Sequence, residues 1–186
     1  MRGRSLALLL VCAPLIATAV SPSFAVDYYP IAGATARALR AEMNRLGPTN
    51  EAGRNDGITH WDIQWRHDYD RNAGGCTAVN VRVTLAVRMT MPRWTPPANA
   101  PRALIVTWQQ FVDALRKHED GHYKLSIEAA DEVERVLRVN RTASDCKRLE
   151  ARLNVAGKEV LEDLRRRHAR YDRDTDSGRK QGTNVL

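Results

Sequence analysis

The sequence lacks any apolar run long enough to cross a membrane. Its longest run, residues 6–20, has roughly fifteen residues, whereas a transmembrane helix needs about 20. Arg2 and Arg4 precede this run, and Ser23 and Ala25 place small residues at its far end. This pattern is typical of a secretory signal peptide. We therefore expect residues 1–25 to be removed on export. The mature protein, residues 26–186, is then periplasmic or secreted, with no stable membrane insertion.

The chain also has little excess charge of one sign. Without Arg2 and Arg4, 27 of its 29 Lys and Arg residues remain against 22 Asp and Glu residues, which leaves a net charge of +5. Several arginines gather at residues 165–173, where a solvated helix face is a simpler interpretation than a patch for an acidic partner. Because an exported protein seldom meets nucleic acid, we predict no nucleic-acid partner. The absence of internal repeats and the share of apolar residues, 43%, predict one globular domain.

Cysteine is scarce. Of the three cysteines, Cys12 lies in the expected signal peptide, so the mature chain keeps only Cys76 and Cys146. In an oxidising compartment, two cysteines favour one disulfide over two free thiols. In the chain-entropy model, a loop of this size stabilises the fold by about 4 kcal/mol.

Apolar residues alternate with polar residues over two segments. This period of two predicts strands at residues 59–69 and 78–91, joined by a turn at residues 72–75. Before them we expect a short strand at residues 27–31 and a short helix that begins after Thr35 and stops at Gly47. The strict alternation of residues 78–91, with Val79 as the first apolar position, favours an antiparallel sheet with one face against a core.

The second half of the chain has helical periodicity. One helix is expected from Thr107, which with Gln110 resembles a capping box, to Val136, and a second from Cys146 to Leu164. The connection near residue 140 is short, so the two helices form an antiparallel hairpin. The predicted fold class is α+β, with a small antiparallel sheet packed on the two helices.

Two histidines interrupt the apolar stripe of the first of these helices. Residues 118–122 read His-Glu-Asp-Gly-His, the HExxH pattern. Residues four apart lie on one helix face, so His118 and His122 can bind one zinc ion. Glu119 is rotated by about 100°, in a position to act as general base toward a water activated by zinc. Gly121 costs about 1 kcal/mol relative to alanine, which indicates that another group approaches the backbone there. Two separately partnered core histidines, or a purely structural metal, are the alternatives.

A catalytic zinc ion usually has three protein ligands and one water. Glu128 has the spacing of an extended metzincin motif, but on an unbroken helix it lies about 9 Å along the axis from His122, which nearly excludes it. On the second helix, Asp163 would be level with the histidine pair if the hairpin turns near residue 141. His168 and Asp172 would lie beyond it. The residues by themselves leave Asp163, His168 and Asp172 open.

The expected mature chain resembles a bacterial family of unknown function that is described as predicted secreted zinc-dependent proteases. Besides the HExxH motif and the two cysteines, the resemblance rests on Asp27-Tyr28-Tyr29, the Trp61/Trp65 strand, Met91-Pro92-x-Trp94 and a C-terminal motif, YDxxTxHGxxQG. The motif residues that match are Tyr171, Asp172, Thr175, Gly178, Gln181 and Gly182, whereas Ser177 stands where the family usually has histidine.

This resemblance implies a zincin-like fold. It also favours Asp172, or the position of Ser177, as the third metal ligand. Since serine is a poor zinc ligand, we expect His118, His122 and Asp172 to bind Zn²⁺.

The expected function is that of a zinc metallopeptidase with a peptide or protein substrate. Zinc would acidify a water molecule and Glu119 would accept its proton, while Tyr171 or His168 could stabilise the oxyanion. The alternative is a non-catalytic periplasmic module that binds zinc or a protein partner. In a peptidase of this design an extended substrate pairs with a sheet edge, and residues 78–91 are the longest candidate for that edge.

Overall fold

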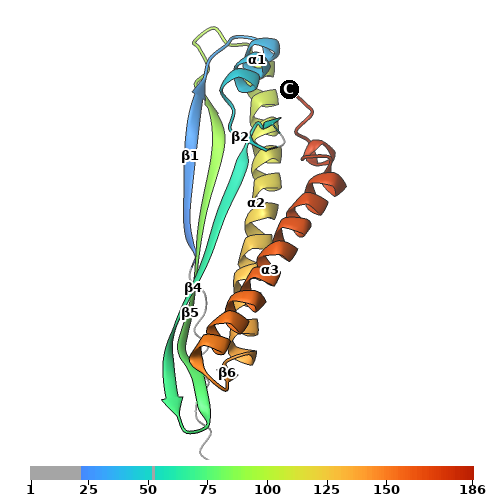
Figure 1. Ribbon diagram of the computed structural model, residues 1–186. Coiled ribbons are helices and arrows are strands. Elements are labelled where there is room, and N and C mark those ends of the chain that lie inside the picture. The colour runs from blue at the N-terminus through green and yellow to red at the C-terminus, as the bar shows by residue number, and fades with distance from the viewer. Residues whose placement is uncertain (1–21, 52) are drawn as a thin grey trace, which may run out of the picture.

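Two long helices cover one face of a mixed β-sheet (Figure 1). The computed structural model describes residues 22–51 and 53–186. The elements, in chain order, are β1 (Ser23–Ile31), α1 (Ala36–Leu46), β2 (Thr49–Asn50), β3 (Gly53–Arg54), β4 (Ile58–Asn72), β5 (Gly75–Trp94), α2 (Arg102–Val139), β6 (Thr142–Ala143), α3 (Cys146–Thr175) and a 3-10 turn, η1 (Arg179–Gln181). The α+β class and the antiparallel helix hairpin are therefore as predicted.

Most of the expected signal peptide, residues 1–25, lies outside the described residues. Its last three residues, 23–25, belong to β1, which pairs with β5 from Ser23 onward. Cleavage after Ala25 would still leave Val26 to Ile31 paired with residues 89–94 of β5. The first strand of a chain that begins at residue 26 would thus be retained.

Strand β5 lies at the centre of the sheet. It pairs in parallel with β1 on one side and in antiparallel with β4 on the other, and its first residues also pair with β6. The expectation of a purely antiparallel sheet is therefore wrong. Alternation shows which residues face the core, but it is the same for a parallel and an antiparallel neighbour. The direction of β1 depends on α1, which carries the chain from the end of β1 toward the start of β4.

The proposal that residues 78–91 form a free edge for substrate is wrong for the part of β5 beside the candidate ligands. From residue 86 onward β5 has β1 on one side and β4 on the other, and Thr59, which contacts Glu119, lies opposite Met89 in this part. Residues 79–85 of β5 pair with β4 alone among the described strands, and β4 is the outer strand of the sheet. Among the described strands, none pairs with the other side of β4.

A bulge breaks the alternation of β5. The register shifts between Arg66 and Asp68 of β4, so Asn80 and Val81 of β5 share one opposing residue. Asn80 has φ 51°, in the left-handed region that asparagine tolerates better than most residues. The buried positions are odd-numbered from Val81 to residue 91 and even-numbered before the bulge, so Val79 is only half-buried. The bulge thereby turns Cys76 toward the helices.

Two helices are longer than predicted: α2 extends at both ends, and α3 begins at Cys146 as predicted but ends later. Helix α2 starts at Arg102, and Thr107 donates to the carbonyl of Ala103 as an interior helix residue instead of forming a cap. Helix α3 continues to Thr175, so Asp172 lies in its last turn. Helix α1 matches its prediction, because the Thr35 side chain accepts from the Ala38 N–H. No helix of the described residues is long and apolar enough to cross a membrane.

The core consists of two apolar clusters that meet along α2. The upper cluster joins α1, the end of β5 and the first half of α2, as far as Leu115. The lower cluster joins β4, β5, α3 and the second half of α2, from Ala129 onward. His118 and Glu119 are buried between them. The polar interruption of the helix is therefore placed where the two clusters adjoin.

The Cys76–Cys146 bridge generates the first prediction. The two sulfur atoms are 2.09 Å apart and the Cα atoms 5.1 Å, and the bridge joins β5 to the first turn of α3. The mature protein should show no alkylatable thiol by mass spectrometry before reduction and two after it. Cys146→Ser should lower the free energy of unfolding by about 4 kcal/mol, because the unfolded chain gains freedom. Two alkylated thiols in the unreduced protein would contradict the bridge.

Candidate metal centre

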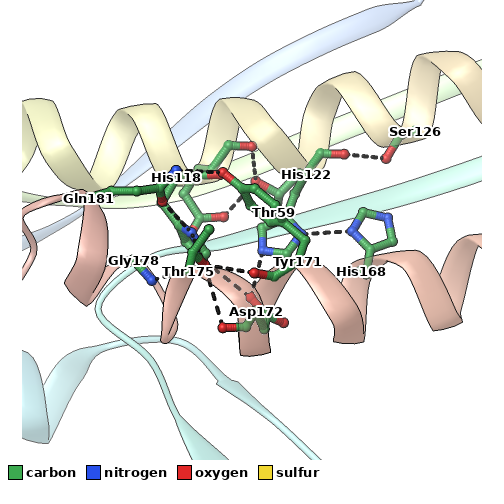
Figure 2. A network of polar contacts seen from close by, with 11 residues as sticks. Thr59, His118, His122, Ser126, His168, Tyr171, Asp172, Thr175, Gly178 and Gln181 are labelled. Carbon is green, nitrogen blue, oxygen red and sulfur yellow. Dashed lines mark hydrogen bonds and ion pairs between the residues drawn. The ribbon is translucent and has the colours of Figure 1, made fainter.

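Helices α2 and α3 bring His118, His122 and Asp172 together (Figure 2). The Asp172 Oδ1 atom lies 3.0 Å from His122 Nε2 and 3.3 Å from His118 Nε2. Two ligand atoms that each lie 2.0–2.1 Å from a tetrahedral ion are about 3.4 Å apart. The three side chains could therefore hold a metal ion. Their geometry does not by itself identify which metal.

The other candidate ligands lie elsewhere. His168 Nδ1 is 2.7 Å from Nδ1 of His122, on the side of that ring opposite to Asp172. Asp163 is exposed and forms ion pairs with neighbouring arginines, and Glu128 pairs with Arg167 across the helices. Asp163 was expected to be level with the histidines if the hairpin turned near residue 141. Instead α3 starts only after β6 and runs obliquely to α2, so a later residue comes level (Figure 1).

Tyr171 occupies the space that Gly121 leaves free. An ideal Cβ on Gly121 would overlap the Tyr171 hydroxyl and would lie 2.7 Å from its Cε1 atom. The tyrosine ring stacks on His118 at 5.1 Å between centroids and meets His122 edge-on at 5.0 Å. Gly121 was expected to admit a close neighbour, and Tyr171 is that neighbour. The Tyr171 hydroxyl donates to the His118 carbonyl oxygen at 3.2 Å, so it is engaged on the helix backbone.

Glu119 is buried beside the candidate ligands, with 3% of its surface exposed. Thr59 of β4 donates to Glu119 Oε2 at 2.7 Å. Burial raises the pKa of the Glu119 carboxyl above its usual value, and the Thr59 hydrogen bond and the nearby His122 and His118 offset this only in part. The carboxylate is thus both oriented and more basic than an exposed glutamate. Sequence reasoning missed Thr59, which no motif marks.

The charges of the cluster suit a cation. Burial raises the pKa of Asp172, but hydrogen bonds from His118 and His122 outweigh it and hold that pKa well below its usual value. Burial lowers the pKa of His118, yet Asp172, Glu119 and Gln181 raise it overall. Burial and the neighbouring His122 lower the pKa of His168 to about 4. At neutral pH, Asp172 is therefore ionised and His168 is neutral.

The C-terminal segment forms one wall of the site. Gln181 Oε1 lies 3.0 Å from Nδ1 of His118, and Gln181 Nε2 donates to the Tyr171 hydroxyl at 3.0 Å. The periodicity of the sequence ended before this segment, so only the C-terminal motif pointed to Gln181. Ser177, with φ 49°, lines the cleft but does not belong to the cluster of residues that could hold a metal ion.

An open cleft of about 960 Å³ leads to the site. The first residues of β4, at positions 58–61, line it together with Arg54 and Asp56. Arg165 of α3, which lies over the Trp61 ring, and Arg179 of the C-terminal turn line it as well. Glu119, His118, His122 and Asp172 also line the cleft, so a ligand in it can reach the candidate metal position.

Residues 26–179 match the family described as "Bacterial protein of unknown function (DUF922)", and the chain belongs to this family. The match begins at the first residue of the expected mature chain and includes the HExxH motif and Asp172. Neither the curated proteins nor the solved structures contain a match to the chain. The family assignment is thus confirmed, and its description assigns no activity.

The contact between Gly121 and Tyr171 generates a second prediction. In most helix interiors, Gly→Ala stabilises by about 1 kcal/mol. Here Gly121→Ala should instead destabilise by about 1–3 kcal/mol, because the methyl group displaces the Tyr171 ring. Urea unfolding measures this change. In a Tyr171→Ala background the same substitution should be neutral or stabilising, and equal effects in both backgrounds would show that the contact is unimportant.

Proposed function

We propose that this protein is an exported, zinc-dependent metallopeptidase that hydrolyses peptide bonds of peptide or protein substrates on a zincin-like fold. One observation carries the proposal: a buried carboxylate, Glu119, adjoins a His118–His122–Asp172 cluster in an open cleft. Export is supported by the N-terminal sequence and by the disulfide, a bond typical of oxidising compartments.

The donor set fits zinc. Two imidazole nitrogens and one carboxylate oxygen are a usual set for catalytic zinc, which keeps its fourth position for water or substrate. Magnesium and calcium prefer sites built from oxygen ligands alone. His118 and His122 would bind through Nε2 and Asp172 through Oδ1, since these are the atoms that face one another.

Zinc at this position would supply Lewis acidity, which makes water more acidic and polarises a substrate carbonyl. Glu119 then has the part of general base and, later, of general acid. Its carboxylate accepts a proton from the attacking water and delivers it to the leaving amine. The raised pKa of Glu119 brings its basicity closer to neutral pH, where proton transfer in both directions is efficient. The Thr59 hydroxyl holds one carboxylate oxygen and leaves the other for water.

The cleft suits an extended chain. Residues 58–61 of β4 line it, and β4 is the outer strand of the sheet on that side. Main-chain hydrogen bonds to such an edge hold a peptide irrespective of its sequence. The expected oxyanion roles are not retained, because the Tyr171 hydroxyl bonds to the His118 backbone and His168 contacts the His122 ring.

Metal content provides the third prediction. The mature protein should retain about one zinc ion per chain after dialysis, as measured by plasma mass spectrometry. His118→Ala, His122→Ala and Asp172→Ala should each abolish this retention, because two ligands hold zinc weakly. Asp163→Ala is the matched control on the same helix, since its carboxylate pairs with arginines, and it should retain zinc. Undiminished zinc in both histidine variants would refute the assignment.

Hydrolysis of casein provides the fourth prediction. Glu119→Gln should lower the rate by at least about 100-fold, since the amide cannot accept the proton, while the zinc content stays unchanged. Asp120→Asn, which alters only a surface ion pair with Arg116, is the control and should remain active. Zinc binding without any hydrolysis, or hydrolysis that is indifferent to Glu119→Gln, would favour the non-catalytic module.

A further inference from the structure

We propose that Gln181 is the positioning residue of His118, so that the C-terminal segment, residues 176–186, is a working part of the metal site. The inference rests on the proposed zinc site and adds a residue whose part in it neither the HExxH motif nor the family description assigns. Three hydrogen bonds link Gln181, Tyr171 and His118.

The direction of these bonds follows from one fixed acceptor. The backbone carbonyl of His118 can only accept, so the Tyr171 hydroxyl donates to it at 3.2 Å. The same hydroxyl oxygen then accepts from Gln181 Nε2 at 3.0 Å. The amide group of Gln181 is thereby oriented, and its Oε1 atom faces His118 Nδ1 at 3.0 Å as an acceptor. These three hydrogen bonds form a closed series that starts at the His118 carbonyl and ends at the His118 imidazole. The last bond requires a proton on Nδ1.

That tautomer is the one a metal ligand needs. A neutral imidazole that carries its proton on Nδ1 presents a lone pair at Nε2. His118 Nε2 is the atom that faces Asp172 at 3.3 Å. An acceptor on the second ring nitrogen fixes both the tautomer and the ring orientation of a metal ligand. Thr175 Oγ1 is 3.4 Å from the same Nδ1 atom, a longer contact than that of Gln181.

The turn after α3 places Gln181 against His118. Asp176, Ser177 and Gly178 have φ values of 53°, 49° and 83°, and after this left-handed turn the chain runs along α2, with Gly178 beside His118 and Gly182 beside Ala114. Gly178 packs on the imidazole, where an ideal Cβ would lie 3.2 Å from His118 Cγ. Two consecutive non-glycine residues in this region are strained, so the surrounding contacts must hold the turn in place. Thr183, buried beyond η1, is one of the residues that anchor it.

His122 provides an internal reference. Its Nδ1 atom faces His168 and not Gln181, at 2.7 Å. A substitution of Gln181 should therefore change the tautomer and orientation of the His118 imidazole and leave those of the His122 imidazole unchanged.

The test compares zinc affinity and imidazole protons in variants of the mature protein. Gln181→Met keeps the length of the side chain but removes the acceptor, and should weaken zinc binding by about 10–100-fold in competition with a chromophoric chelator. Gln181→Glu restores an acceptor and should bind zinc about 10-fold more tightly than Gln181→Met. Lys180→Met, an exposed neighbour in η1, is the matched control and should bind as the unmodified protein does.

Nuclear magnetic resonance of the zinc-loaded proteins separates a specific effect on His118 from a general loss of packing, because a general loss would affect the signals of both histidines. The exchange-protected Nδ1–H signal of His118 should disappear in Gln181→Met and persist in Gln181→Glu, while the signal of His122 persists in both. Thermal unfolding of the zinc-free variants checks that they fold, and if Gln181→Met is unfolded, Gln181→Glu decides by its own signal and affinity.

Each result decides between the proposals. If the unmodified protein binds no zinc, the proposed function and this inference both fall. If it binds zinc and Gln181→Met matches it in affinity and in the His118 signal, only the inference falls. A Gln181→Glu variant that binds as weakly as Gln181→Met, or that lacks the His118 signal, would likewise overturn the acceptor role of Gln181.

Discussion

The close approach of Tyr171 to Gly121 is the contact on which the candidate metal centre depends. A glycine in mid-helix weakens α2, yet it lets α3 approach closely enough for the Tyr171 ring to lie against both histidine rings. Asp172 follows Tyr171 directly, so the contact that positions the tyrosine also brings the aspartate to the Nε2 atoms. The separation of the two helices is thus set at the site itself.

The position of the site between two apolar clusters explains why its hydrogen bonds are so extensive. Burial of an unpaired polar group costs free energy, and the cost rises for charged groups. The buried side chains His118, Glu119 and Ser126 each have a partner: Glu119 has Thr59, His118 has Gln181 and Asp172, and Ser126 has the His122 carbonyl. His168 bonds to His122 through Nδ1, whereas its buried Nε2 atom has no hydrogen-bond partner. Residues from α2, α3, β4 and the C-terminal segment supply these partners. The site can therefore form only when all four segments are in place.

The contacts at the start of α3, far from the candidate metal centre, set the register of this helix against α2. The bulge at Asn80 turns Cys76 toward the helices, and the disulfide with Cys146 fixes the first turn of α3. Strand β6 pairs with residues 76–77 of β5 and fixes the connection just before it. An α-helix rises 1.5 Å per residue, so its starting point decides which later residue comes level with His122. Because α3 is anchored beyond the end of α2 and runs obliquely, that residue is Asp172 and not Asp163.

The amino-acid sequence by itself determined the features that depend on near neighbours or on simple counts. The α1 cap at Thr35, the long helices, the common face of His118 and His122, the unusual Gly121 and the pairing of the two remaining cysteines all follow from local spacing or composition. The residues by themselves left Asp172 open among three candidate ligands, and only the family resemblance favoured it. Tertiary structure alone decided the parallel direction of β1, the bulge that moves Val79 off the core face, and the contacts of Thr59 with Glu119 and of Gln181 with His118. These features depend on where one element lies against another, and no local pattern encodes that distance, because the same periodicity is compatible with several registers and directions.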